Sequence, residues 1–340
     1  MIPGITRLVL LDSNVWIGER MLHSPLGAAL LYALVQAGGR IALPEIVRRE
    51  VDAVLLRDFD RTIETMDKSA RWIRQLTGRH VSVTAPSRIA AEAAFRERWT
   101  GLAGTLAEVP FTLDQANAAL DKILRRDPPS GPNNEQFRDC CIWEAALELA
   151  ASVPVHLVTS DRAFFQERSI AGGLASSLAA EARRLDRTVS LHSSLDGVLR
   201  HEGIAAAATI NDVAIKAAIT TMIASKVEEL STDGGRTFEP SKPLRIVING
   251  YATPVPSEIA VAFETDFRLD EAIGSSGRDP LRLKLSIKGS LNWVPSANEA
   301  TDWQISGWSK SLDGSGPGFS GSSWEPAFSS NFEAGQFQIL

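Results

Sequence analysis

Short apolar runs alternate with longer stretches of helical periodicity along the first 200 residues. The predicted strands span residues 7–11, 40–43, 154–159 and 188–192. The predicted helices span residues 26–37, 44–76 (one or two long helices), 88–103, 113–126, 137–151 and 174–186, with a further helix beginning at 164–168. Continuous apolar strands are typical of a sheet that is buried on both faces. Their alternation with helices predicts βαβ units and hence a parallel sheet between two layers of helices.

The pattern changes where the alanine-rich segment 203–209 begins, a composition typical of a linker. One amphipathic helix is predicted at about 210–230, and residues 281–293 then alternate strictly between apolar and polar, which predicts a strand with one buried face. The remaining candidate strands are LRIVING, EIAVAFETDF and DWQISGW. We therefore expect a three-layer α/β/α domain over residues 1–202 and a smaller, mostly antiparallel β (α+β) domain over 203–340.

Composition and charge narrow the class of protein. A hydrophobic content of 44% with 22% charged residues is typical of a globular chain, and no apolar run approaches the ~18 residues of a membrane span. The N-terminus has no basic segment before a long apolar stretch, so no signal peptide is expected and a cytoplasmic location is predicted.

The two parts of the chain differ in charge. Residues 1–200 contain 24 Lys+Arg and 24 Asp+Glu, whereas residues 201–340 contain 11 and 17. An acidic C-terminal domain repels free nucleic acid and fits a protein partner, an oligomer contact or a cover over a site in the first domain.

Several kinds of chemistry are disfavoured. Cys140 and Cys141 are adjacent, a spacing that suits neither a disulfide framework nor a zinc site, so we expect them to be buried packing residues. The five histidines are scattered along the chain without metal-ligand spacing. The phosphate-binding loop, the dinucleotide-binding glycine motif, the zinc-protease motif and the serine-hydrolase elbow are all absent, which disfavours ATP- and NAD-dependent activities.

Carboxylates follow two of the predicted strands. Asp12 and Asp161 lie where parallel strands end, and ligands bind in the crevice beyond those ends. Glu50, in the second helix of the pattern, and Asp139, near a helix start, are able to join them, although each acid alone also fits a helix cap or a solvated surface group. Acids that face one crevice repel one another, and their oxygen-only ligand set favours a hard cation such as Mg²⁺ or Mn²⁺.

Further acids compete for two of these positions. Glu45 is five residues before Glu50, but it lies in the first helical turn, where an acid already interacts with the helix dipole, so we prefer Glu50. The acids that flank Asp139 are Glu135, Glu144 and Glu148. A register error in that helix would exchange one of them for Asp139.

Four segments, in this order, resemble the acidic blocks of PIN-domain nucleases. They are LVLLDSNVWI, LPEIVRREV, FRDCCIWEAALELA and VHLVTSDRAFF. The resemblance covers about residues 6–192 and is especially strong to the bacterial type in which a Pro-rich stretch precedes an aromatic residue, an Asp and an Ile-Trp helix. It implies a PIN-like fold and an Mg²⁺- or Mn²⁺-dependent nuclease. The implied metal-binding and catalytic acids are Asp12, Glu50, Asp139 and Asp161, with Asn14 and Ser160 as polar supports.

The resemblance also implies a substrate. Family members are typically ribonucleases, so we expect an endoribonuclease that acts on single-stranded RNA, and a toxin or defence role with an antitoxin partner is a family-level hypothesis. Cleavage of DNA fits the same acids, because no visible feature reads the 2′-OH. A degenerate PIN-like binding or scaffold protein, or a different kind of Mg²⁺ hydrolase, is also consistent with the pattern, since a fold does not fix a function.

Side chains near the acids complete the expected site. Arg126 and Arg138 flank the Pro-rich stretch before Asp139 and are the candidate phosphate contacts. Trp16 and Trp143 are aromatic residues of the kind that stack on bases in single-strand binders, but their apolar surroundings favour core packing.

Overall fold

The computed structural model describes most of the chain. The described residues are 5–79, 84–131, 135–185, 188–201, 210–233, 236–239, 241–271 and 281–312. They divide into two compact units. The first contains residues 5–21 and 34–198, and the second contains 22–33 and the described part of 199–312. The predicted linker 203–209, the predicted boundary between residues 202 and 203, and residues 313–340 lie outside the described residues.

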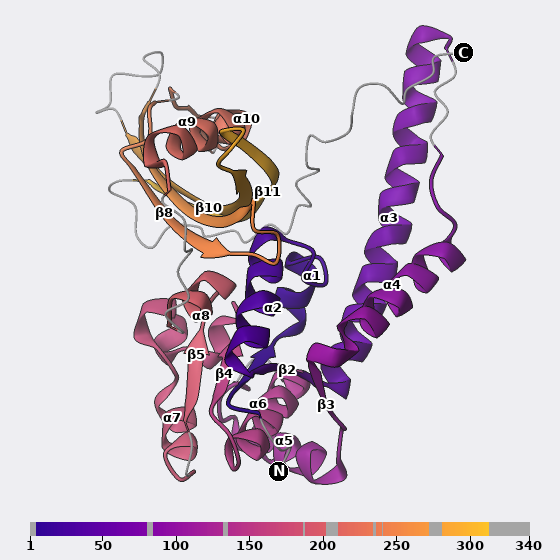
Figure 1. The fold of residues 1–340 in the computed structure, drawn as a ribbon, viewed down its shortest axis with the longest axis vertical. Coiled ribbons are helices and arrows are strands. Elements are labelled where there is room, and N and C mark those ends of the chain that lie inside the picture. The colour runs from indigo at the N-terminus through magenta and orange to yellow at the C-terminus, as the bar shows by residue number, and fades with distance from the viewer. Residues whose placement is uncertain are drawn as a thin grey trace. The chain divides into compact units, whose positions relative to one another are not determined.

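The first unit is built on a five-stranded parallel sheet (Figure 1). Its strands are β1 (Leu8–Leu11), β2 (Arg40–Pro44), β3 (Leu106–Val109), β4 (Val155–Val158) and β5 (Val189–His192). The order is β3-β2-β1-β4-β5, so the chain winds outward through β2 and β3 on one side of β1 and through β4 and β5 on the other. Strands β1 and β4 are buried along their whole length and pair in parallel at this change of direction. The parallel sheet with flanking helices confirms the predicted fold class.

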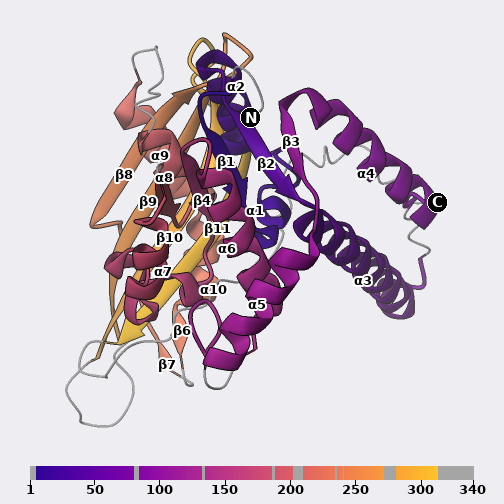
Figure 2. The ribbon, with the colours of Figure 1, turned by 90° about the horizontal axis from the view of Figure 1, so that it is seen from below.

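The helices of this unit follow the predicted pattern closely. The predicted ones are α3 (Glu45–Thr77), α4 (Arg88–Leu102), α5 (Leu113–Arg125), α6 (Phe137–Ala150) and α7 (Ser176–Ala182), together with α2 (Pro25–Ala37), which divides between the two units. Two helices were not predicted: α1 (Ser13–Gly18), and α8 (Leu195–His201), which also divides between the units. Helix α3 is a single helix of 33 residues that has Pro44 as its N-cap. Helix α4 runs beside α3, and α5 packs beside α6 (Figures 1 and 2). The capping box at Thr112 and Gln115 is present as predicted.

Some local predictions were wrong. No helix begins at residues 164–168, where the chain instead forms short 3₁₀ turns. They are η2 (Arg162–Phe164), η3 (Gln166–Arg168) and η4 (Ile170–Gly172), and a fourth turn, η1 (Ala103–Thr105), precedes β3. Glu167 and Arg168 have φ angles of 53° and 55°, which no right-handed helix accommodates. Strand β3 was not predicted, because four residues with an exposed Glu108 carry too weak an apolar signal.

The second unit contains an antiparallel sheet, as predicted, and its four strands lie in the order β11-β10-β9-β8. Its elements are α9 (Asp212–Met222), α10 (Ala224–Leu230), β6 (Thr232–Asp233), β7 (Arg236–Thr237), β8 (Arg245–Ala252), β9 (Ile259–Asp270), β10 (Arg282–Val294) and β11 (Glu299–Leu312). Along β10, Leu283 and Leu285 are buried while Lys284 is exposed, which confirms the alternating pattern. The single amphipathic helix predicted at about 210–230 is two helices, because the backbone at Ile223 departs from helical geometry.

The burial of particular residue types agrees with the sequence. Cys140 and Cys141 are free and buried, and Trp16 and Trp143 are fully buried in the core. No helix among the described residues combines the length and the apolar character that crossing a membrane requires.

Candidate active site

Asp12 is fixed at the end of the central strand β1, where it caps α1. Its Oδ1 accepts hydrogen bonds from the Ser13 backbone N–H (2.6 Å) and the Ser13 hydroxyl (3.3 Å), and its Oδ2 accepts one from the Thr159 hydroxyl (2.6 Å). Only 3% of the residue is exposed. Burial is the main cause that raises the pKa of Asp12; the hydrogen bonds from Thr159 and Ser13 oppose it, and the nearby charge of Asp161 adds to the rise.

Asp161 reaches the same edge of the sheet from β4. The parallel register pairs Leu11 with Val158, so the next residues along the two strands, Asp12 and Thr159, leave the sheet together. The Thr159 hydroxyl donates to Asp12 and accepts from the Asp161 N–H (3.0 Å). The Asp161 carboxylate accepts from the Ala163 N–H (2.8 Å) and from the Gln136 side-chain amide (3.1 Å). One threonine therefore links the two strand-ending aspartates.

Asp139 brings a third carboxylate from the first turn of α6. The pKa of Asp139 is raised to about 7, mainly by burial and then by the charges of Asp12 and Asp161, while the charge of Arg138 lowers it. Burial and nearby like charges both disfavour the charged form of a carboxyl group. The structure thus brings together three of the four predicted acids.

Glu50 lies on α3 and has a different partner. Its Oε1 accepts a hydrogen bond from a guanidinium Nη1 of Arg138, and only 16% of its side chain is exposed. Glu50 is not among the charges that shift the pKa of Asp139. The fourth predicted acid is therefore tied to the residue directly before Asp139, and the Arg138 side chain is engaged with an acid.

The acids that compete with Glu50 and Asp139 in the sequence make contacts of their own. Glu45 accepts from the Phe111 N–H (3.1 Å) and pairs with Arg49. Glu148 accepts from the side-chain amide of Gln115 (2.7 Å), a residue of α5. Glu135 is exposed.

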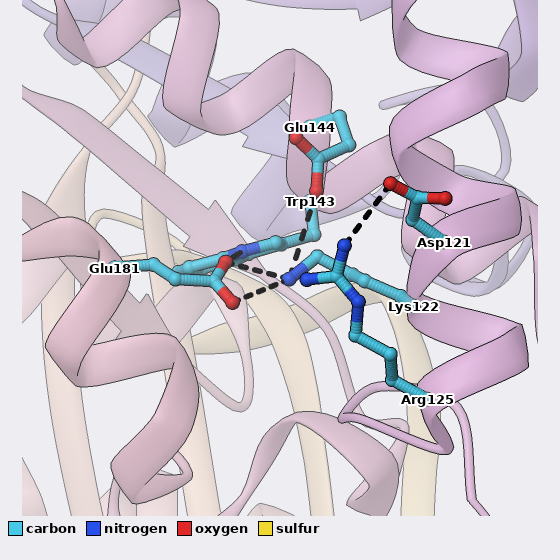
Figure 3. A network of polar contacts seen from close by, with 6 residues as sticks. All are labelled: Asp121, Lys122, Arg125, Trp143, Glu144 and Glu181. Atoms are coloured by element: carbon cyan, nitrogen blue, oxygen red, sulfur yellow. Dashed lines mark hydrogen bonds and ion pairs between the residues drawn. The ribbon is translucent and has the colours of Figure 1, made fainter.

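Glu144, the remaining competitor, belongs to a second charged cluster on α6 (Figure 3). The Lys122 ammonium donates to both carboxylate oxygens of Glu181 (2.6 Å each) and lies 3.7 Å from Glu144 Oε1. The indole N–H of Trp143 also donates to Glu181 (2.7 Å). Only 9% of the Lys122 side chain is exposed, so this network joins α5, α6 and α7 through a buried cation. Burial is the main cause that raises the pKa of Glu144.

Sequence reasoning did not identify Thr159, Gln136 or Lys122. Thr159 was detectable in principle, because it is the last residue of a predicted strand, but its role depends on β4 pairing with β1. Gln136 is the N-cap residue of α6, a position that the expected helix start already implied. Lys122 and Glu181 are far apart in the sequence, and no spacing connects them.

The remaining residues of the predicted site are Asn14, Ser160 and Arg126. Asn14 follows Asp12 in α1, and its Oδ1 is buried without a hydrogen-bond partner. Gln136 Oε1 is also buried without a hydrogen-bond partner, whereas the amide nitrogen of the same side chain donates to Asp161. Ser160 is partly buried, and Arg126 is exposed at the C-cap of α5.

The donors of this site suit a hard divalent cation in their chemistry. Among the described residues, no three His, Cys, Asp or Glu side chains lie close enough together, as placed, to hold a metal ion. The three aspartates nevertheless offer only oxygen donors, and a bound cation would oppose the burial and the mutual repulsion that raise the pKa of Asp139. The buried, unpartnered amide oxygens of Asn14 and Gln136 add neutral oxygen donors of the same kind.

Comparison with known proteins gives one match. A family model described as PIN domain matches residues 9–164, a range that includes Asp12, Glu50, Asp139 and Asp161. No curated protein and no solved structure matches the chain.

Proposed function

We propose, from the premise that residues 9–164 of this chain are a PIN domain, that the protein is an Mg²⁺- or Mn²⁺-dependent endoribonuclease that hydrolyses phosphodiester bonds in single-stranded RNA. PIN domains are generally nucleases, and a nucleic-acid substrate follows from that. The cation, the preference for RNA and the roles of individual residues are the content of the proposal.

One observation carries the assignment. Asp12, Asp139 and Asp161 come from three separate elements, and the charges of Asp12 and Asp161 add to the effect of burial in raising the pKa of Asp139 to about 7. A protein gains no stability from carboxylates that repel one another, so such a cluster points to a function that uses the charge. Binding a divalent cation is that function.

The residues take separate roles in this proposal. Asp12, Asp139 and Asp161 would hold the cation, and Glu50 would be a fourth acid placed by Arg138. When bound, the cation would activate a water molecule and neutralise charge that develops on the phosphate.

Two neighbouring residues, Thr159 and Gln136, would position the acids. Thr159 fixes the directions of the Asp12 and Asp161 segments, and Gln136 orients the Asp161 carboxylate.

A cleavage assay tests this proposal. Purified full-length protein is incubated with labelled single-stranded RNA, or with DNA of the same sequence, in Mg²⁺, Mn²⁺ or EDTA. Asp139→Asn is compared with Glu148→Gln, a change of acid to amide on the same helix at a residue that contacts Gln115. We expect Asp139→Asn to lower the rate at least about a hundredfold, since it removes charge at a metal site, and Glu148→Gln to stay within about threefold.

The outcomes distinguish the candidate functions. Equal cleavage by wild type and Asp139→Asn, or full cleavage in EDTA, would overturn the proposed site. Cleavage of DNA alone would replace the ribonuclease by a deoxyribonuclease. No cleavage by any protein, together with no Mn²⁺ binding, would favour a nucleic-acid-binding or scaffold protein.

A further inference from the structure

A pocket of about 290 Å³ lies beside the turn that carries Asp161. Ala163, whose N–H donates to Asp161, forms part of its wall. The turn Pro128–Gly131 and the loop Phe165–Arg168 line the pocket, together with the start of α7. A single water needs on the order of 10–15 Å³, so this pocket accommodates a much larger group.

The lining favours an anion. It contains two guanidinium groups, Arg126 and Arg168, and one acid, Glu167. Among the described residues, neither arginine side chain takes part in an ion pair. The Arg168 guanidinium lies close to the Pro-rich turn, as the distance of 3.2 Å between its Nη2 and a Cβ added at Gly131 indicates. The lining also contains Ser177, whose hydroxyl oxygen is buried without a hydrogen-bond partner.

We propose that this Arg126–Arg168 pocket binds a phosphate group of the nucleic-acid strand that is adjacent to the bond cleaved at the aspartates. The inference rests on the proposed function and adds to it the residues that hold the strand. Guanidinium groups bind phosphate oxygens in bidentate fashion, and such contacts fix the register of a strand on a protein. Arg168 was not predicted from the sequence, whereas the predicted Arg138 is paired with Glu50.

The backbone conformation at Arg126 permits a substitution that removes the guanidinium without destabilising the fold. Arg126 is the C-cap of α5 with a φ of 60°, a left-handed conformation that glycine adopts without strain. Arg126→Gly therefore removes the cation and should leave the thermal midpoint unchanged or higher. Arg168→Met removes the second cation, and Arg125→Met is the matched control, because Arg125 is adjacent in sequence, pairs with Asp121 and is absent from the pocket lining.

The test measures binding of single-stranded RNA by fluorescence anisotropy. All proteins carry Asp139→Asn so that the strand stays intact in Mg²⁺. The probes are one labelled RNA and a series in which each phosphate in turn is replaced by a neutral methylphosphonate. For the protein with both arginines, we expect one position at which neutralisation weakens binding about tenfold, the scale of one charge-assisted contact.

The double variant Arg126→Gly/Arg168→Met should bind the unmodified RNA about tenfold more weakly and should lose its sensitivity to that position, with a shallower salt dependence. Arg125→Met should behave as its parent. A probe with a 5′-phosphate compared with a 5′-hydroxyl identifies whether the bound phosphate is a strand end or an internal diester. Unchanged affinity and unchanged sensitivity in the double variant would overturn the inference.

Failure of this inference is distinguishable from failure of the proposed function. Binding is measured without cleavage, so a position-specific loss in the double variant supports the pocket even where the wild-type protein cuts no substrate. A wild-type protein that cleaves RNA, with no position sensitive to Arg126 and Arg168, refutes the pocket alone. Arg126→Gly alone should weaken RNA binding less than the double variant does, and a folding defect should not contribute to this loss because glycine adopts the backbone conformation at residue 126 without strain.

Discussion

Helix α6 contributes acids to two clusters that differ in whether a buried cation of the chain lies beside the carboxylates. Glu144, near the middle of the helix, lies beside the buried ammonium of Lys122, which also binds Glu181. Asp139, in the first turn, faces Asp12 and Asp161, and the one nearby cation that lowers its pKa, Arg138, is hydrogen-bonded to Glu50. The first cluster contains a buried cation of the chain, and we propose that the second binds a divalent cation from solution.

The difference teaches how to separate a structural acid from a functional one. A buried carboxylate with a buried lysine stabilises the packing of the helices that supply the pair, and removal of one partner is costly. Carboxylates that raise the pKa of one another reduce stability and persist because they do something else. By this criterion we propose that Asp139 belongs to a functional site and that Glu144 stabilises the position of α6.

The largest effect is expected when the structural cluster loses its cation. Lys122→Met leaves Glu144 and Glu181 without a positive partner, and we expect the free energy of unfolding to fall by about 3–5 kcal/mol. Urea denaturation measures it. Arg125→Met, which breaks an exposed pair on the same helix, should change stability by less than about 0.5 kcal/mol. A loss no greater than that of this control would remove the distinction between the clusters.

The aspartate cluster should respond with the opposite sign. The folded pKa of Asp139 is about 7, above the ordinary value of 3.8, so the folded state holds this proton more tightly than the unfolded state. The free energy of unfolding should therefore fall as pH rises between these values.

Asp139→Asn should remove this fall in the free energy of unfolding, because an amide does not ionise. In EDTA it should stabilise the protein by on the order of 2–4 kcal/mol at about pH 8, and the gain should vanish near pH 4. Denaturation across this pH range provides the measurement. Destabilisation by Asp139→Asn at the alkaline end would contradict the account of an uncompensated charge.

A smaller effect is expected at the threonine that joins the two strand-ending aspartates. Thr159→Val keeps the shape but removes the hydroxyl, so Mn²⁺ affinity should fall about tenfold, as for other residues that orient metal ligands. Thr159→Ser should restore it. Titration calorimetry is the measurement, and equal Mn²⁺ affinities of Thr159→Val and wild type would show that these hydrogen bonds do not position the acids.

The smallest effect should come from Glu50. Because its carboxylate is paired with Arg138, Glu50→Gln should lower the cleavage rate by no more than about tenfold, the scale of a group that contributes through positioning. Glu45→Gln is the matched control on the same helix and should leave the rate unchanged. If Glu45→Gln has the larger effect, the second acid of the site has been assigned to the wrong residue.

The sequence predicted the framework of the site because that information is local. The apolar runs that end in Asp12 and Asp161 identified β1 and β4, and the helical periodicity around Asp139 identified α6. Parallel strands share an edge, so convergence of the first two acids required no knowledge of side-chain contacts.

Further features depended on contacts that no local pattern encodes. The role of Thr159 requires the pairing of β1 with β4, and the partner of Lys122 lies on α7, a distant helix. The turns at Glu167 and Arg168 use positive φ angles at residues other than glycine, which sequence patterns rarely signal. For that reason a helix was predicted where one wall of the Arg126–Arg168 pocket lies.

The charge of the aspartate cluster, on this account, is reserved for a divalent cation. Mn²⁺ binding, measured by electron paramagnetic resonance and calorimetry at about pH 8 and again at about pH 6, tests this claim most directly. Wild type and Glu148→Gln should bind Mn²⁺ alike and more weakly at the lower pH, where protons compete, while Asp139→Asn should bind at least about tenfold more weakly. Equal Mn²⁺ binding by Asp139→Asn and wild type, or no binding by either, would contradict the account.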